Sequence, residues 1–87
     1  MKYALERWKS RYWKVIVYDD DGTRLMEVAA IYTRHGLYVN GTLADPRHGA
    51  LFLSLAHRLA DAAAGASQVG TVREVVEDTL RGVRWST

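Results

Sequence analysis

The sequence predicts an α+β domain in which a three-stranded antiparallel β-meander packs against helices, in the order α-β-β-β-α-α. Three observations predict this fold. The middle of the chain is rich in β-branched and aromatic residues, and turn sequences interrupt it at 19–22 and 35–36. The segments on either side repeat apolar residues at the spacing of a helix. With 87 residues, the chain is long enough for a single core, so we expect one domain over residues 1–87.

The N-terminal segment predicts a short helix. Its apolar residues recur at i, i+3, i+4, i+7 and i+11, which would place them along one stripe of a helix. These residues are Met1, Ala4, Leu5, Trp8 and Tyr12.

Three strands are expected next. The first runs over Trp13–Tyr18, and the acidic, glycine-ended sequence 19–22 supplies the turn. The second covers Thr23–Arg34, and His35-Gly36 reverses the chain before a short third strand over Leu37–Val39, which ends at Asn40-Gly41. The residues of the second strand expected to face the core are Met26, Val28, Ala30 and Tyr32.

A helix is expected from Asp45-Pro46 to about Ala64. Aspartate caps free backbone N–H groups, and proline fits the first turn because its missing N–H costs no hydrogen bond there. The apolar arc of this helix spans about 200° at 100° per residue, too wide for one sheet face. Its second covering surface would be the final helix or another subunit.

The last helix is expected from Thr71, where Thr71 and Glu74 match a capping box, to about Gly82. Glu77 and Arg81 form a favourable i, i+4 pair on the solvent face. The apolar stripe of this helix consists of Val72, Val75, Val76, Thr79, Leu80 and Val83.

Composition and spacing argue against an enzyme and against a bound cofactor or metal. The chain has no cysteine, which excludes disulfides, thiolate metal sites and thiol nucleophiles. Ser54, His57 and Asp61 share one helix face, but a serine in mid-helix has no free N–H groups beside it to stabilise an oxyanion. No apolar run reaches the roughly 20 residues of a membrane span, and the start lacks the apolar stretch of a signal peptide, so we expect a cytoplasmic protein without a membrane partner.

The first fourteen residues carry five bases and one acid, hence a charge of +4, whereas the chain as a whole carries +2. Aromatic residues lie between these bases, a combination that can contact phosphates and stack on bases. The alternative is that Trp8, Tyr12 and Trp13 are core or strand residues and the bases are solvated on the outside of the domain. The candidate partner or nucleic-acid contacts are Tyr3, Arg7, Lys9, Arg11, Trp13, Lys14 and Arg47.

The expected order α-β-β-β-α over residues 1 to 64 resembles that of the double-stranded-RNA-binding domain. That family opens its second helix with a lysine cluster on the major-groove phosphates. The equivalent stretch here, Pro46-Arg47-His48-Gly49-Ala50, offers Arg47 and His48 for the same role. The resemblance is therefore one of topology.

Two functions follow as hypotheses. The first is a small non-enzymatic protein-binding regulator or inhibitor, of the accessory kind carried by phages and other mobile elements. It would act as a homodimer through the wide apolar arc, at Leu53, Ala56 and Ala60. The alternative is a nucleic-acid-binding protein that uses the basic and aromatic N-terminal segment.

Overall fold

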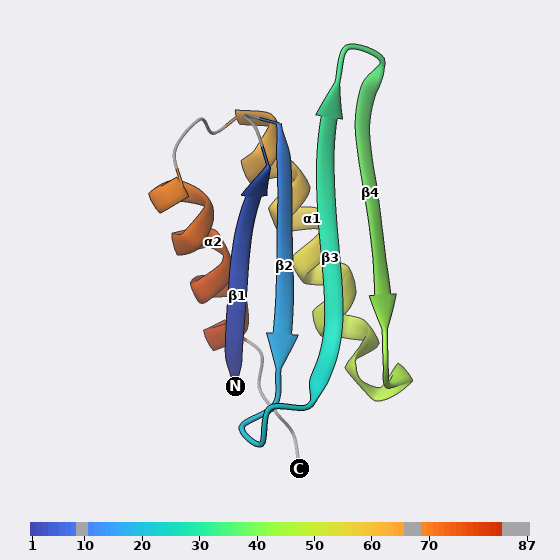
Figure 1. Ribbon diagram of the computed structural model, residues 1–87, viewed down its shortest axis with the longest axis vertical. Coiled ribbons are helices and arrows are strands. Elements are labelled where there is room, and N and C mark those ends of the chain that lie inside the picture. Colours follow the sequence, from blue (N-terminus) through green and yellow to red (C-terminus); the bar gives the residue numbers. More distant parts are fainter. Residues whose placement is uncertain (9–10, 66–68, 83–87) are drawn as a thin grey trace.

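The computed structural model describes residues 1–8, 11–65 and 69–82, and within them it shows an α+β fold. Four antiparallel strands form one sheet in the order β1-β2-β3-β4, and two helices pack on one of its faces (Figure 1). The elements are β1 (Lys2–Trp8), β2 (Tyr12–Tyr18), β3 (Arg24–Thr33), β4 (Gly36–Leu43), a 3-10 turn η1 (Pro46–His48), α1 (Gly49–Gly65) and α2 (Val69–Gly82).

The N-terminal segment is a strand, so the predicted N-terminal helix and the order α-β-β-β-α-α are wrong. Tyr3 and Leu5 of β1 pair with Val17 and Val15 of β2, and all four side chains face the helices. The segment fits both a helical period and a period of two, and pairing with β2 decides between them because it packs Tyr3 and Leu5 together against the core. With a strand in place of the first helix, the topological resemblance to the double-stranded-RNA-binding domain is lost.

The rest of the meander follows the prediction more closely. β2 and β3 lie where they were expected, and Gly22 and Gly36 turn the chain at φ values of 90° and 134° that favour glycine. The last strand is longer than predicted, because it continues through Asn40-Gly41 and ends at Leu43. Gly41 is needed within this strand, since an added Cβ would lie 2.9 Å from the ring of Phe52 on α1.

The predicted helix start at Asp45-Pro46 is confirmed. The carboxylate of Asp45 accepts a hydrogen bond of 3.0 Å from the backbone N–H of Arg47, and η1 leads directly into α1. By contrast, α2 begins at Val69, so Thr71 lies inside the helix and is not its capping residue.

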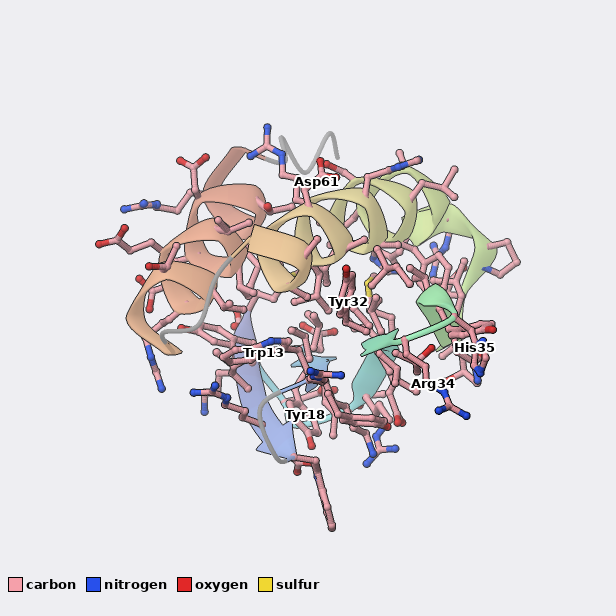
Figure 2. All side chains as sticks on the ribbon, turned by 90° about the horizontal axis from the view of Figure 1, so that it is seen from above. Trp13, Tyr18, Tyr32, Arg34, His35 and Asp61 are labelled. Atoms are coloured by element: carbon pink, nitrogen blue, oxygen red, sulfur yellow. The ribbon has the colours of Figure 1, made fainter. Side chains whose placement is uncertain are left out.

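Of the predicted stripe of α2, Val72, Val76 and Thr79 are buried, and Val75 and Leu80 are half-buried. Val83 lies outside the described residues. The core lies between this helix pair and the sheet (Figure 2), and Trp13, Val15, Val17, Met26, Val28 and Ala30 line its sheet side. In the described part of the chain, neither helix is long and apolar enough to cross a membrane.

Candidate functional site

The face of the sheet opposite the helices is covered by no helix or strand of the described chain (Figure 1). Neighbouring residues of adjacent strands share a face when they lie opposite each other in the ladder. Trp8 lies opposite Tyr12, Tyr12 opposite Ile31, and Ile31 opposite Tyr38. These four side chains, here called the aromatic row, therefore cross all four strands on the open face.

The aromatic row holds the most exposed rings of this face. Trp8 is 63% exposed and Tyr38 is 55% exposed, while Tyr12 and Ile31 between them are half-buried. Adjacent strands lie about 4.8 Å apart, so the row spans about 14 Å from Trp8 to Tyr38. It is a strip of four side chains with two accessible rings at its ends.

Two shallow hollows adjoin the row. One, of about 320 Å³, is lined by Trp8, Tyr12 and Lys14. The other, of about 130 Å³, lies between Tyr12 and β4, where Ala29 and Asn40 form part of its lining. Both hollows include Tyr12, so its ring separates two adjoining depressions in the open face.

Positive charge gathers at the end of the sheet where the aromatic row lies. Because the strands run alternately up and down, the β1–β2 and β3–β4 connections share one end, and the acidic β2–β3 turn lies at the other (Figure 1). Arg11 and Arg34 lie in the connections beside the row, and in the described residues neither takes part in an ion pair. The Arg34 Nε donates a 3.2 Å hydrogen bond to Nε2 of His35, next to it in the turn (Figure 2).

Lys14 also lies on the open face, one row farther along the sheet. Its Nζ is 2.8 Å from Oε1 of Glu27, and this hydrogen bond raises the pKa of Lys14 and lowers that of Glu27. Arg24 also approaches Glu27, with Nη1 3.2 Å from Oε2. The charge of Lys14 is therefore partly balanced, whereas Arg11 and Arg34 are available to an anion.

Three of the predicted contact residues point to the helix side and not to this face. Trp13 is fully buried, and the guanidinium carbon of Arg7 lies 4.9 Å from the centre of its ring. Tyr3 donates a 2.6 Å hydrogen bond from its hydroxyl to Oε1 of Glu77 on α2. Arg81, the predicted partner of Glu77, has its Nη2 4.0 Å from Oδ1 of Asp78. Burial, and then this bond to Glu77, raises the pKa of Tyr3.

Arg47 lies apart from the other predicted contacts. It follows β4 at the far end of the sheet and donates hydrogen bonds of 2.8 and 2.6 Å to Asp45, whose pKa they lower to about 2. Lys9 lies outside the described residues. Of the predicted contacts, the structure thus brings Lys14 to the open face and places Arg11 in the β1–β2 connection, at the end of the sheet where the aromatic row lies.

The predicted oligomer residues on α1 differ in exposure. Leu53 is 60% exposed, Ala56 is half-buried and Ala60 is buried. Ala60 is therefore not available to a second subunit, and Leu53 remains the exposed apolar side chain of that set.

Sequence reasoning missed Trp8 and Tyr38 as site residues. The helical spacing of the N-terminal segment predicts Trp8 on a buried stripe, and the short strand expected over Leu37–Val39 gives Tyr38 no role in a site. The alternation of Lys2, Ala4, Glu6 and Trp8 with Tyr3 and Leu5 was the signal that could have placed Trp8 on an outer face.

Comparison with known proteins gives no match: no protein-family model fits the chain, and no curated protein or solved structure is significantly similar to it. In the described residues, no three histidine, aspartate or glutamate side chains gather where they could hold a metal ion. The open face of the sheet is therefore the feature from which a function can be inferred.

Proposed function

We propose that this protein binds single-stranded nucleic acid, without catalysing a reaction, through the open face of its sheet. The observation that carries the proposal is the aromatic row, with Trp8 and Tyr38 exposed on a face that no described element covers. Aromatic side chains on such a surface stack on nucleobases whatever the base, and each stacked base contributes about 1–3 kcal/mol.

The charges beside the row support the same function. Arg11 and Arg34 lie in the two connections at the row's end of the sheet, where a strand laid along the row would place its phosphates. The bases of a single strand can turn toward the rings, whereas those of a duplex are already stacked and paired. The geometry therefore favours a single strand over a duplex.

The test is a titration with a short single-stranded oligonucleotide, followed by tryptophan fluorescence. Trp8→Ala and Tyr38→Ala should each weaken binding by about tenfold or more. Tyr18→Ala is the matched control, because Tyr18 lies on the same side of the sheet as Tyr12 but at the opposite end of β2. Equal loss in Tyr18→Ala, or no binding by the unaltered protein at low salt, would refute the proposal.

Salt dependence provides a second measurement. If Arg11 and Arg34 each neutralise one phosphate, the logarithm of the binding constant should fall with the logarithm of salt concentration with a slope of about −1.4. Replacing both arginines by glutamine should bring this slope close to zero while leaving stacking on Trp8 in place.

A second candidate function is a protein-binding regulator or inhibitor. It is favoured by the same two exposed rings, since tryptophan and tyrosine also dominate the energetics of protein interfaces. A protein partner bound mainly through these rings would be retained at high salt, whereas a nucleic acid would be released.

A further inference from the structure

The outer edge of the sheet, strand β4, presents unpaired backbone groups. In an antiparallel ladder, alternate residues bond to the neighbouring strand and those between them point their N–H and C=O away from it. The Ala44 N–H donates to the Leu25 carbonyl at 3.0 Å, which places Ala44 in a bonded pair and continues the β3–β4 ladder. Counting back along the strand, the residues whose backbone groups face outward are Leu37, Val39, Gly41 and Leu43.

One of these outward groups confirms the count. The Gly41 N–H donates a 2.8 Å hydrogen bond to Oδ1 of its neighbour Asn40. An N–H directed at β3 could not make this bond. The β2–β3 ladder gives the same result. The Tyr32 N–H donates a 2.8 Å hydrogen bond to the Arg11 carbonyl, so the even-numbered residues of β3 bond to β2. The odd-numbered residues of β3 are left to bond β4.

Strand β4 lacks the charges, prolines and bulges that protect an exposed edge, and of its outward N–H groups that of Gly41 is occupied by the Asn40 side chain. Natural sheets protect their edges with charged side chains, prolines or bulges. From Gly36 to Leu43 the chain has no charged residue and no proline, and its register with β3 runs without a shift. The opposite edge, β1, carries Lys2, Glu6 and Arg7.

Apolar side chains are exposed on both faces of β4. Val39 is 46% exposed and Leu37 is 37% exposed on the helix side of the sheet, and Tyr38 is exposed on the open side. A strand added along β4 would cover part of each of these side chains while pairing the outward backbone groups.

We propose that β4 pairs with β4 of a second copy of this chain, in antiparallel orientation, to form a continuous eight-stranded sheet. A two-fold axis perpendicular to the sheet brings the same strand of two identical chains together, so the interface needs no second kind of protein. The uncharged sequence of β4 favours a copy of itself, because no like charges meet across the axis. The helices of both copies then lie on one face and both open faces on the other.

The experiment measures the oligomeric state of the protein alone, without nucleic acid, so its result does not depend on the proposed function. Sedimentation from micromolar to millimolar concentration should show conversion of monomer to dimer. Val39→Lys should abolish the dimer, because a lysine on an exposed edge opposes pairing. Leu53→Lys is the matched control, with the same change of charge at an exposed apolar position of α1.

A monomer at millimolar concentration would overturn the proposal. So would a dimer that persists in Val39→Lys, or one that Leu53→Lys disrupts instead, since the latter would place the interface on α1. Far-UV circular dichroism of each variant establishes that it is folded before its oligomeric state is compared.

Amide hydrogen exchange gives a second readout on the unaltered protein. In the monomer, the amides of Tyr38, Asn40 and Thr42 are protected by β3, whereas those of Leu37 and Val39 face solvent. Raising the protein concentration should protect Leu37 and Val39 selectively. Equal exchange of these two amides at all concentrations would contradict pairing along β4.

Discussion

The two faces of the sheet are built from the same four strands but have opposite properties. On the helix side, β2 and β3 present Trp13, Val15, Val17 and Val28, all of them fully buried. On the open side, the strongly exposed rings gather in the aromatic row at one end, while Ile16 and Ala29 are nearly covered. In β1 and β2, the position of a tryptophan in the alternation of its strand decides whether its ring is buried against the helices or exposed on the open face.

Two tryptophans show this difference most directly. Trp13 and Trp8 are five residues apart in neighbouring strands, and they lie on opposite faces because Trp8 pairs with Tyr12 while Trp13 pairs with Arg7. One is fully buried and the other is 63% exposed. Substitutions at these two positions separate folding from binding.

The largest effect is expected at Trp13. Trp13→Ala removes a fully buried ring and should lower the free energy of unfolding by about 3–5 kcal/mol, a large part of the total for a small domain. Trp13→Phe should cost much less, because the Trp13 Nε1 has no hydrogen-bond partner within the described structure. Trp8→Ala should leave the unfolding midpoint in urea close to that of the unaltered protein, and a large shift there would contradict the assignment of the two faces.

The next effect is expected where β4 meets the helix layer. An added Cβ at Gly41 would lie 2.5 Å from the backbone oxygen of Glu27 and 2.9 Å from the Phe52 ring. Gly41→Ala should therefore destabilise the protein by about 1–3 kcal/mol. In Gly49→Ala, at the start of α1, nothing lies within 4 Å of the added atom, so thermal unfolding should show no loss of stability.

The features that local chemistry determines were predicted from the sequence. Gly22 and Gly36 are the turn residues because their φ values favour glycine, and Asp45 caps the helical segment through its own side chain. β2, β3 and α1 follow because their apolar periods are unambiguous. An α+β fold was therefore within reach of sequence reasoning.

The N-terminal strand and the open face were not predicted, for one physical reason. Leu5 and Trp8 fit a helical stripe, yet in β1 they point to opposite faces, because pairing with β2 replaces the local helical preference. The candidate site differs from the predicted one for the same reason: Trp8 is exposed, whereas Tyr3 and Trp13 lie on the helix side of the sheet. Local periodicity contains no information about which neighbouring strand a segment pairs with.

A smaller effect is expected at the hydrogen bond between β1 and the helix layer. Tyr3→Phe removes the 2.6 Å bond to Glu77 and should cost about 1 kcal/mol. Because burial raises the pKa of Tyr3 above its ordinary value of 10.0, its contribution is complete below pH 10 and is lost as the pH rises through the folded-state pKa. The difference in stability between the two proteins should therefore shrink at strongly alkaline pH, and a constant difference would contradict this role.

The smallest effect is expected at the ion pair on the open face. The hydrogen bond from Lys14 lowers the pKa of Glu27 below its ordinary value of 4.5, so the contribution of Glu27 is complete above pH 4.5 and is lost as the pH falls through the lower folded-state value. Water and salt reach this half-buried pair from the open face and screen it, whereas the Tyr3 bond lies between β1 and α2. Lys14→Met should therefore lower the thermal midpoint slightly at neutral pH and low salt, and this difference should vanish in molar salt or near pH 2. A difference that survives both conditions would show that Lys14 acts by packing on the open face and not by its charge.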